Sequence, residues 1–288
     1  MFVISAVLTV LAVVLTVMFG LKFGIDFKGG SVIEVSFDDQ RPTAQELEAV
    51  VSPLNGVNNI SISLAAESDA IIRLNDINEQ THQVVISSLA DKFGGVTENR
   101  FDSIGPTIGN ELRRKSITSI TILLLAVTFY IAFVFRKLSG VLSPWAVSLA
   151  ALGALIHDII VPAGVFALLG HYYGIEVTGV FVAAALTILG YSLSDSVVVF
   201  DRVRENVLKL GSKENFGELV HKSVMQTLIR SLNTTFAALL SLIAIFFFGG
   251  ESIKYFSLAL IIGIFCGAYS SIFVAAPILV WLGKRRKR

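Results

Sequence analysis

The chain has 288 residues, of which 54% are hydrophobic and only 16% are charged, and its mean hydropathy is +0.74. A soluble globular chain contains roughly a quarter charged residues, so this composition excludes a soluble protein and indicates a polytopic membrane protein. The formal net charge of +1 says nothing about partners, and we expect no nucleic-acid binding. The single cysteine, Cys266, excludes an intramolecular disulfide and a cysteine-based metal site.

Six apolar runs are long enough to cross about 30 Å of hydrocarbon. They are Phe2–Phe19, Ile117–Phe135, Val141–Leu169, Thr178–Phe200, Leu232–Phe248 and Tyr255–Leu282. The first run lacks a basic leading segment and a small-residue cleavage site, so we interpret it as a membrane anchor rather than a signal peptide. The sequence therefore predicts six transmembrane helices, with both termini on the same side of the membrane.

Between the first two spans, residues 29–110 form the one stretch large enough for a separate domain. Period-two alternation in SVIEVSF, and similar patterns in NNISISL, DAIIRL and TENRFDSI, predict four strands, with a turn at AAESD. Helix-period apolar residues in PTAQELEAVVSPL and NEQTHQVVISSLADKF predict two helices. The order βαββαβ predicts a ferredoxin-like α+β domain. We thus expect a first helix with its exit motif in residues 1–28, this domain in 29–110, and a five-helix transmembrane domain in 111–288.

Nothing in residues 29–110 indicates an enzyme, because no nucleophile with its base, phosphate loop or metal cluster is present in the sequence. His82 stands alone on the second predicted helix without ligand spacing around it, so we interpret it as a structural histidine. The domain is therefore predicted to be a binding or gripping module.

Basic residues near the ends of the spans predict the orientation of the chain. Three cationic segments fall on the side of the termini, whereas one, at Arg113–Lys115, falls on the other side. The three are the tail Lys284–Arg288, the pair Arg136 and Lys137, and the loop with Arg202, Arg204, Lys209, Lys213 and Lys222. We therefore expect cytoplasmic termini, and residues 29–110 outside.

The fourth span carries an acid before its apolar part ends. Asp195 lies six residues before Asp201, or about 9 Å along a helix that rises about 1.5 Å per residue. Ionisable residues inside a span cost roughly 2.5–3.5 kcal/mol each on insertion and are functional candidates by default. The polar residues near Asp195 are Thr187, Tyr191, Ser192, Ser194 and Ser196. Their spacing is typical of the wall of a polar crevice, and the alternative is an interfacial acid hydrated from the cytoplasm.

Two further spans carry ionisable residues. Arg230 stands at the cytoplasmic entry of the fifth span, where it can pair with Asp195 if the antiparallel fourth and fifth helices face each other. The alternative is a snorkelling arginine at the membrane edge. His157 and Asp158 lie in the third span near Pro162, which is expected to kink that helix. Adjacent residues on a helix do not face each other, so we expect only one of them to line a narrow site, as a structural hydrogen bond or as part of a relay.

These groups predict ion coupling. A carboxylate near an arginine stays ionised, whereas in apolar surroundings it takes up a proton, so alternation between the two couples protonation to helix movement. One proton that crosses 100 mV contributes about 2.3 kcal/mol. The expected coupling ion is H⁺, with Na⁺ as the alternative, and no metal or organic cofactor is expected.

The last span carries a stripe of small residues. Gly263 and Gly267 form a GxxxG pattern, which Ala268, Ser270, Ser271 and Ala275 continue. Such a stripe predicts close helix packing, either within the chain or against a partner.

Five segments, in order, resemble motifs of the SecF branch of the SecD/SecF family. They are FGIDFKGG (Phe23–Gly30), SIGPTIGNEL (Ser103–Leu112), HDIIVPAG (His157–Gly164), GYSLSDSVVVFDRVREN (Gly190–Asn206) and QTLIRSLNTT (Gln226–Thr235). The resemblance covers nearly the whole chain and implies that Asp195 is the family's essential intramembrane aspartate and Arg230 its paired arginine. One departure is Ser194, where the family usually has asparagine.

The resemblance also implies a role for the segment after the first span. Gly24, Asp26, Gly29 and Gly30 match the family's exit motif, which helps to set the join between the membrane and the outer domain.

The resemblance further implies partners and a function. The family's smaller subunit pairs with SecD in a pseudo-symmetric twelve-span assembly related to the resistance-nodulation-division transporters. This assembly associates with the SecYEG channel of the bacterial cytoplasmic membrane, with YajC and YidC as further candidate partners, and uses the proton-motive force to draw preproteins outward. Two alternatives are a proton-coupled exporter of small molecules or lipids, for which residues 29–110 make a small porter region, and a passive scaffold for SecD.

Overall fold

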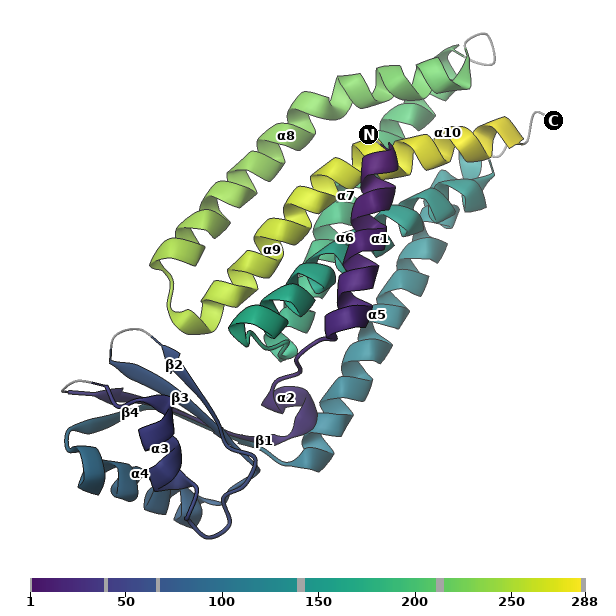
Figure 1. The fold of residues 1–288 in the computed structure, drawn as a ribbon. Coiled ribbons are helices and arrows are strands. Elements are labelled where there is room, and N and C mark those ends of the chain that lie inside the picture. The colour runs from purple at the N-terminus through teal and green to yellow at the C-terminus, as the bar shows by residue number, and fades with distance from the viewer. Residues whose placement is uncertain (1, 39–40, 66–67, 139–142, 211–214, 286–288) are drawn as a thin grey trace. The chain divides into compact units, whose positions relative to one another are not determined.

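The structure is a computed structural model that describes residues 2–38, 41–65, 68–138, 143–210 and 215–285 (Figure 1). Two compact units are present, one formed by Met1–Leu21 with Thr118–Arg288 and the other by Lys22–Ile117. Parts of three predicted features, the AAESD turn, the loop around Lys213 and the basic tail, lie outside the described residues. Each unit is described by itself below.

Long helices form the first unit. In chain order they are α1 (Phe2–Phe19), α5 (Pro106–Val134, from Thr118 on in this unit), α6 (Pro144–Tyr173), α7 (Gly179–Leu210), α8 (Phe216–Phe248) and α9 (Glu251–Ser270). A 3₁₀ turn, η1 (Phe135–Leu138), follows α5, and a π-helical segment, η3 (Ser271–Ala275), joins α9 to α10 (Ala276–Arg285). Among the described residues, six helices are long and apolar enough to cross a membrane, which confirms the predicted number of spans.

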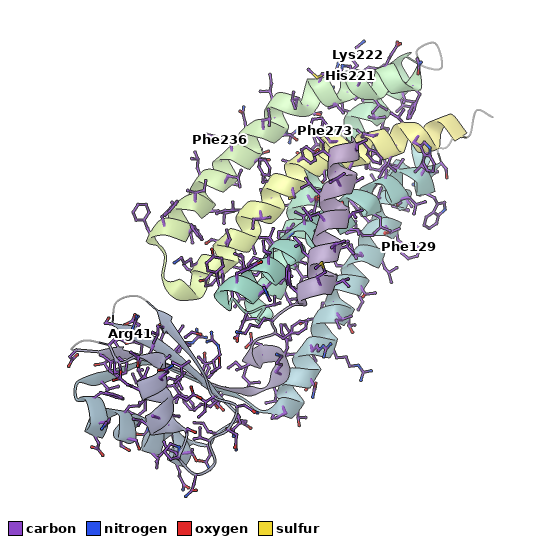
Figure 2. The ribbon with its side chains drawn as sticks, viewed as in Figure 1. Arg41, Phe129, His221, Lys222, Phe236 and Phe273 are labelled. Atoms are coloured by element: carbon purple, nitrogen blue, oxygen red, sulfur yellow. The ribbon has the colours of Figure 1, made fainter. Side chains whose placement is uncertain are left out.

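The helices extend beyond the predicted apolar runs. The helix of the fourth span continues through the charged residues after Asp201 to Leu210, and the next helix begins at Phe216, well before the predicted fifth span. Near this end of α8 lie His221 and Lys222 (Figure 2). Hydrophobicity predicts only the part of a helix that suits the bilayer, whereas the backbone hydrogen bonds continue wherever helix-forming residues follow.

Small residues allow the central helices of this unit to approach closely. A Cβ atom on Gly164 of α6 would lie 2.6 Å from the Cα of Ala12 on α1. On α9, a Cβ on Gly263 would lie 2.2 Å from Ile188 of α7, and one on Gly267 would lie 3.0 Å from Ser192. The small-residue stripe of the last span therefore packs within the chain, against α7.

The outer helices leave broad apolar faces uncovered. The side chains of Phe129 on α5 and Phe236 on α8 are 61% and 64% exposed (Figure 2). Helix α1 buries only Ser5 and Ala12. In contrast, α6, α7 and the last span surround a shared core. The uncovered faces are suited to lipid or to another apolar subunit.

The second unit contains a four-stranded antiparallel sheet in the order β2-β3-β1-β4. Its elements are β1 (Gly30–Phe37), α3 (Ala44–Val51), β2 (Ser61–Ala65), β3 (Asp69–Leu74), α4 (Glu79–Phe93) and β4 (Val96–Ile104). Alternate residues such as Ile33 and Ile72 point to one face, where they share a core with Leu47 of α3 and Leu89 of α4. The predicted ferredoxin-like βαββαβ fold is confirmed.

Local capping and packing support these elements. Thr43 and Glu46 form a capping box at the start of α3, in which each residue's side chain accepts a hydrogen bond from the other's backbone N–H. His82 is buried on α4, its ring stacks on that of Phe101 of β4 at a centroid distance of 3.8 Å, and Glu98 lies 3.2 Å from its Nε2. Its place between helix and strand suits a structural histidine.

The exit motif forms a short helix and a tight backbone contact. Gly24 caps α2 (Ile25–Lys28), which contains Asp26. Gly29 and Gly30 have φ values of 77° and 129°, which side chains rarely adopt. A Cβ on Gly29 would lie 2.8 Å from the Cα of Pro106, and one on Gly30 would lie 2.7 Å from the carbonyl oxygen of Leu74. Glycine is therefore required by both conformation and space.

Candidate functional site

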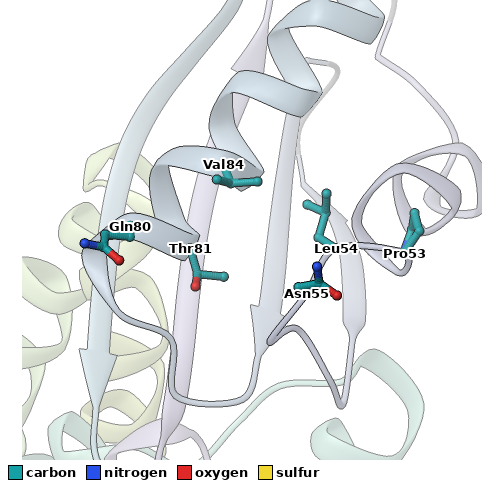
Figure 3. Close-up of a pocket in the computed structure, with 6 residues that line it drawn as sticks. All are labelled: Pro53, Leu54, Asn55, Gln80, Thr81 and Val84. Carbon is teal, nitrogen blue, oxygen red and sulfur yellow. The ribbon is translucent and has the colours of Figure 1, made fainter.

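The second unit has a shallow pocket of about 330 Å³ between the end of α3 and the start of α4 (Figure 3). It is lined by Pro53, Leu54, Asn55, Gln80, Thr81 and Val84. None of these side chains titrates in the range of an acid or base, so the pocket offers no proton chemistry. The chemistry lies instead among the buried carboxylates of the membrane unit.

Two aspartates are buried in the membrane unit. Asp158 on α6 is 0% exposed, and Asp195 on α7 is 9% exposed. A buried carboxylate is costly unless hydrogen-bond donors surround it. Both aspartates meet this condition, because serine hydroxyls from neighbouring helices donate to each of them.

Asp195 joins three elements. Its Oδ1 accepts a hydrogen bond from Ser231 of α8, and its Oδ2 accepts one from Ser271 of η3 at 2.6 Å. Both serines are buried. The carboxylate therefore connects α7, α8 and the π-helical segment, so a change in its charge acts on all three.

Arg230 is the residue before Ser231, but its side chain is exposed. Between these two described residues, Asp195 and Arg230, no ion pair forms. Successive residues on a helix are about 100° apart, so the face of α8 that presents Ser231 to Asp195 turns Arg230 away. Ser231, the neighbour of Arg230, is the α8 side chain that contacts Asp195.

Asp158 has a second set of donors. Its Oδ1 lies 2.9 Å from Nδ1 of His157, and its Oδ2 accepts hydrogen bonds from Ser192 of α7 and from Ser270 of α9, the latter at 2.7 Å. The expectation that only one of His157 and Asp158 lines a narrow site is wrong. Both residues are buried, because other helices cover α6 on several sides. They also contact each other, because the imidazole of His157 extends to the carboxylate of the next residue.

The two carboxylate sites meet at one turn of the last span. Ser270 ends α9 and donates to Asp158, whereas Ser271 begins η3 and donates to Asp195. The π-helical geometry is rare and is frequently found at functional sites. Two consecutive serines thus donate hydrogen bonds to two different aspartates.

The remaining predicted polar residues divide into two groups. Ser192 and Ser196 are buried, and the hydroxyl of Tyr191 is buried as well. Ser194 and Thr187 are exposed, and Thr187 donates to the carbonyl of Ala183 in its own helix. The polar side of α7 is therefore narrower than the predicted crevice wall.

Three residues of the site were not identified as functional from the sequence alone: Ser231, Ser270 and Ser271. Their signal was available, because each is a small hydroxyl residue in or beside an apolar span. The last two belong to the stripe that predicts helix packing, and their second role as donors depends on what the neighbouring helices present.

The comparisons with known proteins agree with this architecture. The family "Protein export membrane protein SecD/SecF, C-terminal" matches residues 84–285, and the "SecD/SecF GG Motif" matches residues 14–40. The protein translocase subunit SecF of Thermobaculum terrenum is 38% identical, over 98% of this chain and 92% of the relative.

Two longer proteins match as well. The protein translocase subunit SecDF of Brucella abortus is 33% identical over 97% of this chain, which spans only 36% of that relative. The crystal structure of SecDF, a translocon-associated membrane protein from Thermus, superposes with a TM-score of 0.83 at 30% identity, over 99% of this chain and 37% of that one. The family matches, the near-complete relative and the shared fold agree, and the chain belongs to the SecD/SecF family of protein export membrane proteins.

Proposed function

We propose that the chain is a SecF-type subunit of a bacterial protein translocase that uses the proton-motive force to promote the export of preproteins. The observation that carries this proposal is the similarity to a SecF subunit over 98% of the chain, together with a buried carboxylate whose donors come from neighbouring helices. The role is transport, and we propose no enzymatic turnover.

The proposed location is the bacterial cytoplasmic membrane, with both termini in the cytoplasm and residues 29–110 outside. The cations at the end of α7, Arg202, Arg204 and Lys209, support this orientation, since positively charged loops favour the cytoplasmic side.

SecD is the proposed partner in the membrane. The chain is similar to 36% and 37% of two proteins named SecDF, which supports association with SecD. The uncovered apolar faces of α5 and α8 offer surface for such a subunit. SecYEG, YajC, YidC and the translocating preproteins are proposed partners of the resulting complex.

Protonation of Asp195 supplies the coupling in this proposal. The ionised carboxylate accepts from Ser231 and Ser271. A protonated carboxyl group gains a donor of its own and loses its charge, so the hydrogen bonds from the two serines lose their charge assistance and weaken. The packing of α7 against α8 and η3 then changes. One proton that crosses 100 mV contributes about 2.3 kcal/mol, which is enough to bias two helix arrangements of similar energy.

Arg230 enters the same cycle through rotation of α8. Because it precedes Ser231, a rotation of that helix by about 100° would exchange the serine for the guanidinium at Asp195. The proposal is that α8 alternates between these two contacts, with the arginine directed to the ionised form of the carboxylate.

The coupling ion in this proposal is H⁺. Both serine hydroxyls donate toward the carboxylate, the arrangement that suits an anion that exchanges a proton. We propose no metal or organic cofactor.

The Asp195→Asn variant tests the proposal in vesicles that contain the complex with SecD and the translocation channel. We expect loss of the gradient-dependent share of preprotein translocation, whereas the complex still assembles. The matched control is Asp201→Asn on the same helix, whose exposed carboxylate pairs with Arg204 at 2.6 Å.

Unchanged gradient dependence in the Asp195→Asn variant would refute the proton-coupling role. Loss of assembly would favour a scaffold, and sensitivity to small molecules with intact export would favour an exporter. A response to a sodium gradient, with none to a proton gradient, would overturn the proposed ion.

A further inference from the structure

Asp158 provides chemistry that the proposed role of Asp195 does not use. It is completely buried, and its carboxylate lies 2.9 Å from Nδ1 of His157. An imidazole and a carboxylate in contact hold one shared proton, as an ion pair or as two neutral groups. Both forms have no net charge, so the pair remains compatible with a low-dielectric interior while its proton changes place.

Spare hydrogen-bonding capacity surrounds both carboxylates. Nε2 of His157, Oγ of Ser196 and Oγ1 of Thr235 are buried and have no hydrogen-bond partner within the described part of the chain. His157 precedes Asp158, Ser196 follows Asp195, and Thr235 lies one helical turn after Ser231. The buried hydroxyl of Tyr191, one turn before Asp195, is a fourth such atom among the described residues. A buried polar atom without a partner is costly, so this group of atoms calls for an explanation.

The backbone of α6 adds an acceptor at the same place. Pro162 lies inside this helix and has no N–H, so the carbonyl of Asp158, four residues earlier, lacks its helical donor. The carbonyl of Asp158 and Nε2 of His157 are therefore two hydrogen-bonding groups beside this carboxylate that remain available to a further partner.

Both carboxylates are tied to the same two elements. Ser192, a donor to Asp158, lies one turn before Asp195 on the same face of α7. Ser270 and Ser271 are consecutive residues that donate to Asp158 and Asp195, respectively. A displacement of either element therefore acts on both sites.

The two serines of the last span have alternative acceptors. The hydroxyl of Ser270 lies 3.2 Å from the carbonyl of Gly267, and that of Ser271 lies 3.0 Å from the carbonyl of Ala268. Either hydroxyl can thus leave its carboxylate for its own helix without losing its hydrogen bond. This removes much of the cost of changing donors when a carboxylate becomes protonated.

The titratable groups on the elements that pack against α6 are few. Helix α1 and segment η3 contain none, and helix α10 carries Lys284 and Arg285 at its C-terminal end. On η1, Arg136 is exposed and lies over the ring of Phe133. On α7 and α9 the titratable groups nearest in sequence to the serine donors are Tyr191, Asp195, Cys266 and Tyr269. Asp195 is the one carboxylate among these four groups, and Asp201, Glu205 and Glu251 lie farther along the same two helices.

We propose that the His157–Asp158 pair is a second proton-binding site and that the Ser270–Ser271 turn couples its proton occupancy to that of Asp195. The coupled step transfers one proton to the pair in its ionised state, a neutral His157 imidazole beside the Asp158 carboxylate. An O–H bond of the Asp195 carboxyl group breaks, an O–H bond forms on Asp158 or an N–H bond forms on His157, and the negative charge moves from the pair to Asp195. Total charge is unchanged. Two carboxylates in one apolar unit disfavour simultaneous ionisation, so the sites influence each other's affinity for the proton.

This inference rests on the proposed function for its place in transport, but its central test does not require translocation. The full chain is purified with SecD, and infrared difference spectra follow the protonated-carboxyl band as the pH is changed. The variants are Asp158→Asn, Asp195→Asn and Ser270→Ala. The matched control is Ser257→Ala, a buried serine of α9 whose hydroxyl donates to two carbonyls of its own helix, those of Ile253 and Lys254.

We expect two titrating carboxyl components that Asp158→Asn and Asp195→Asn remove one at a time. Each of these variants shifts the midpoint of the remaining component by about one pH unit or more, as interacting sites do. Ser270→Ala shifts both midpoints, whereas Ser257→Ala shifts neither. If Asp158→Asn removes no component, or leaves the midpoint of Asp195 unchanged, the second site or its coupling is refuted.

The pH profile of gradient-driven translocation then tests whether the second proton-binding site takes part in transport. We expect Asp158→Asn to displace this profile, whereas a merely structural aspartate would lower the rate equally at every pH. An unchanged profile would overturn the transport role. If Asp158→Asn does not fold, Ser270→Ala carries the same test, because it keeps both carboxylates. Failure of the proposed function is recognised separately, by an unaltered gradient response in Asp195→Asn.

Discussion

The contact between α1 and α6 gives a prediction about stability in the membrane unit. In the Gly164→Ala variant, the new methyl group would lie 2.6 Å from both Cα and Cβ of Ala12 and 2.8 Å from its carbonyl oxygen. Carbon atoms pack at about 3.5–4.0 Å, so the two helices have to separate by about 1 Å. Backbone atoms form most of the obstacle, and rotation of a side chain cannot relieve it.

The expected cost combines two opposing effects. Overpacking of a buried site costs about 1–3 kcal/mol, and replacing a helical glycine by alanine returns about 0.5–1 kcal/mol. Gly190→Ala is the matched control, because Gly190 is exposed on α7 and a Cβ there has no atom within 4 Å. Gly164→Ala should therefore be less stable than Gly190→Ala by about 1–3 kcal/mol.

The assay is unfolding of the purified protein by sodium dodecyl sulfate in mixed micelles, followed by circular dichroism. The free energies of unfolding of the two variants are each compared with that of the parent chain. A Gly164→Ala variant that is as stable as Gly190→Ala would refute the close approach of α1 to α6.

Two further predictions concern the second unit. Thr43→Ala removes the hydroxyl of Thr43 from the capping box of α3 and leaves its backbone N–H in place. This loss should cost about 0.5–2 kcal/mol, measured by thermal unfolding. It should also raise the pKa of Glu46 by loss of the hydroxyl hydrogen bond. Hydrogen bonds from the backbone N–H and hydroxyl of Thr43 lower the pKa of Glu46, so its stabilisation is present above the unfolded pKa of about 4.3 and is lost as pH falls through the folded pKa. An unchanged carboxyl titration of Glu46 in Thr43→Ala would contradict this. Gly30→Ala should cost about 1–3 kcal/mol from the positive φ alone and expose the exit motif to proteolysis, whereas unaltered proteolysis would count against the tight contact.

Local patterns predicted the ferredoxin-like unit well because its signals are short-range. The alternation in β1 and β3 specifies which residues face the helices, and Thr43 with Glu46 marks the start of α3. The same holds for the spans, since the length of an apolar run is a property of the local sequence. The ends of the long helices were less predictable, because hydrophobicity does not report where helical hydrogen bonds stop.

The candidate site shows where local reasoning ends. Asp195 and Asp158 stood out because an acid in an apolar span is rare, but the partners of each aspartate were not evident. Arg230 was the natural counter-charge for Asp195, whereas the structure presents the adjacent Ser231. A rotation of α8 by about 100°, the angle between successive residues, decides whether Arg230 or Ser231 faces Asp195. No sequence pattern within α8 specifies this rotation.

The sequence by itself determined that the chain crosses a membrane six times, carries one ferredoxin-like unit and contains two exceptional aspartates. Composition, periodicity and run length encode these features locally. Only the tertiary structure decided that Ser270 and Ser271 bring α6 and α7 into one connected set of hydrogen bonds. That result depends on the relative rotation and axial offset of helices far apart in the sequence, which their packing against one another sets.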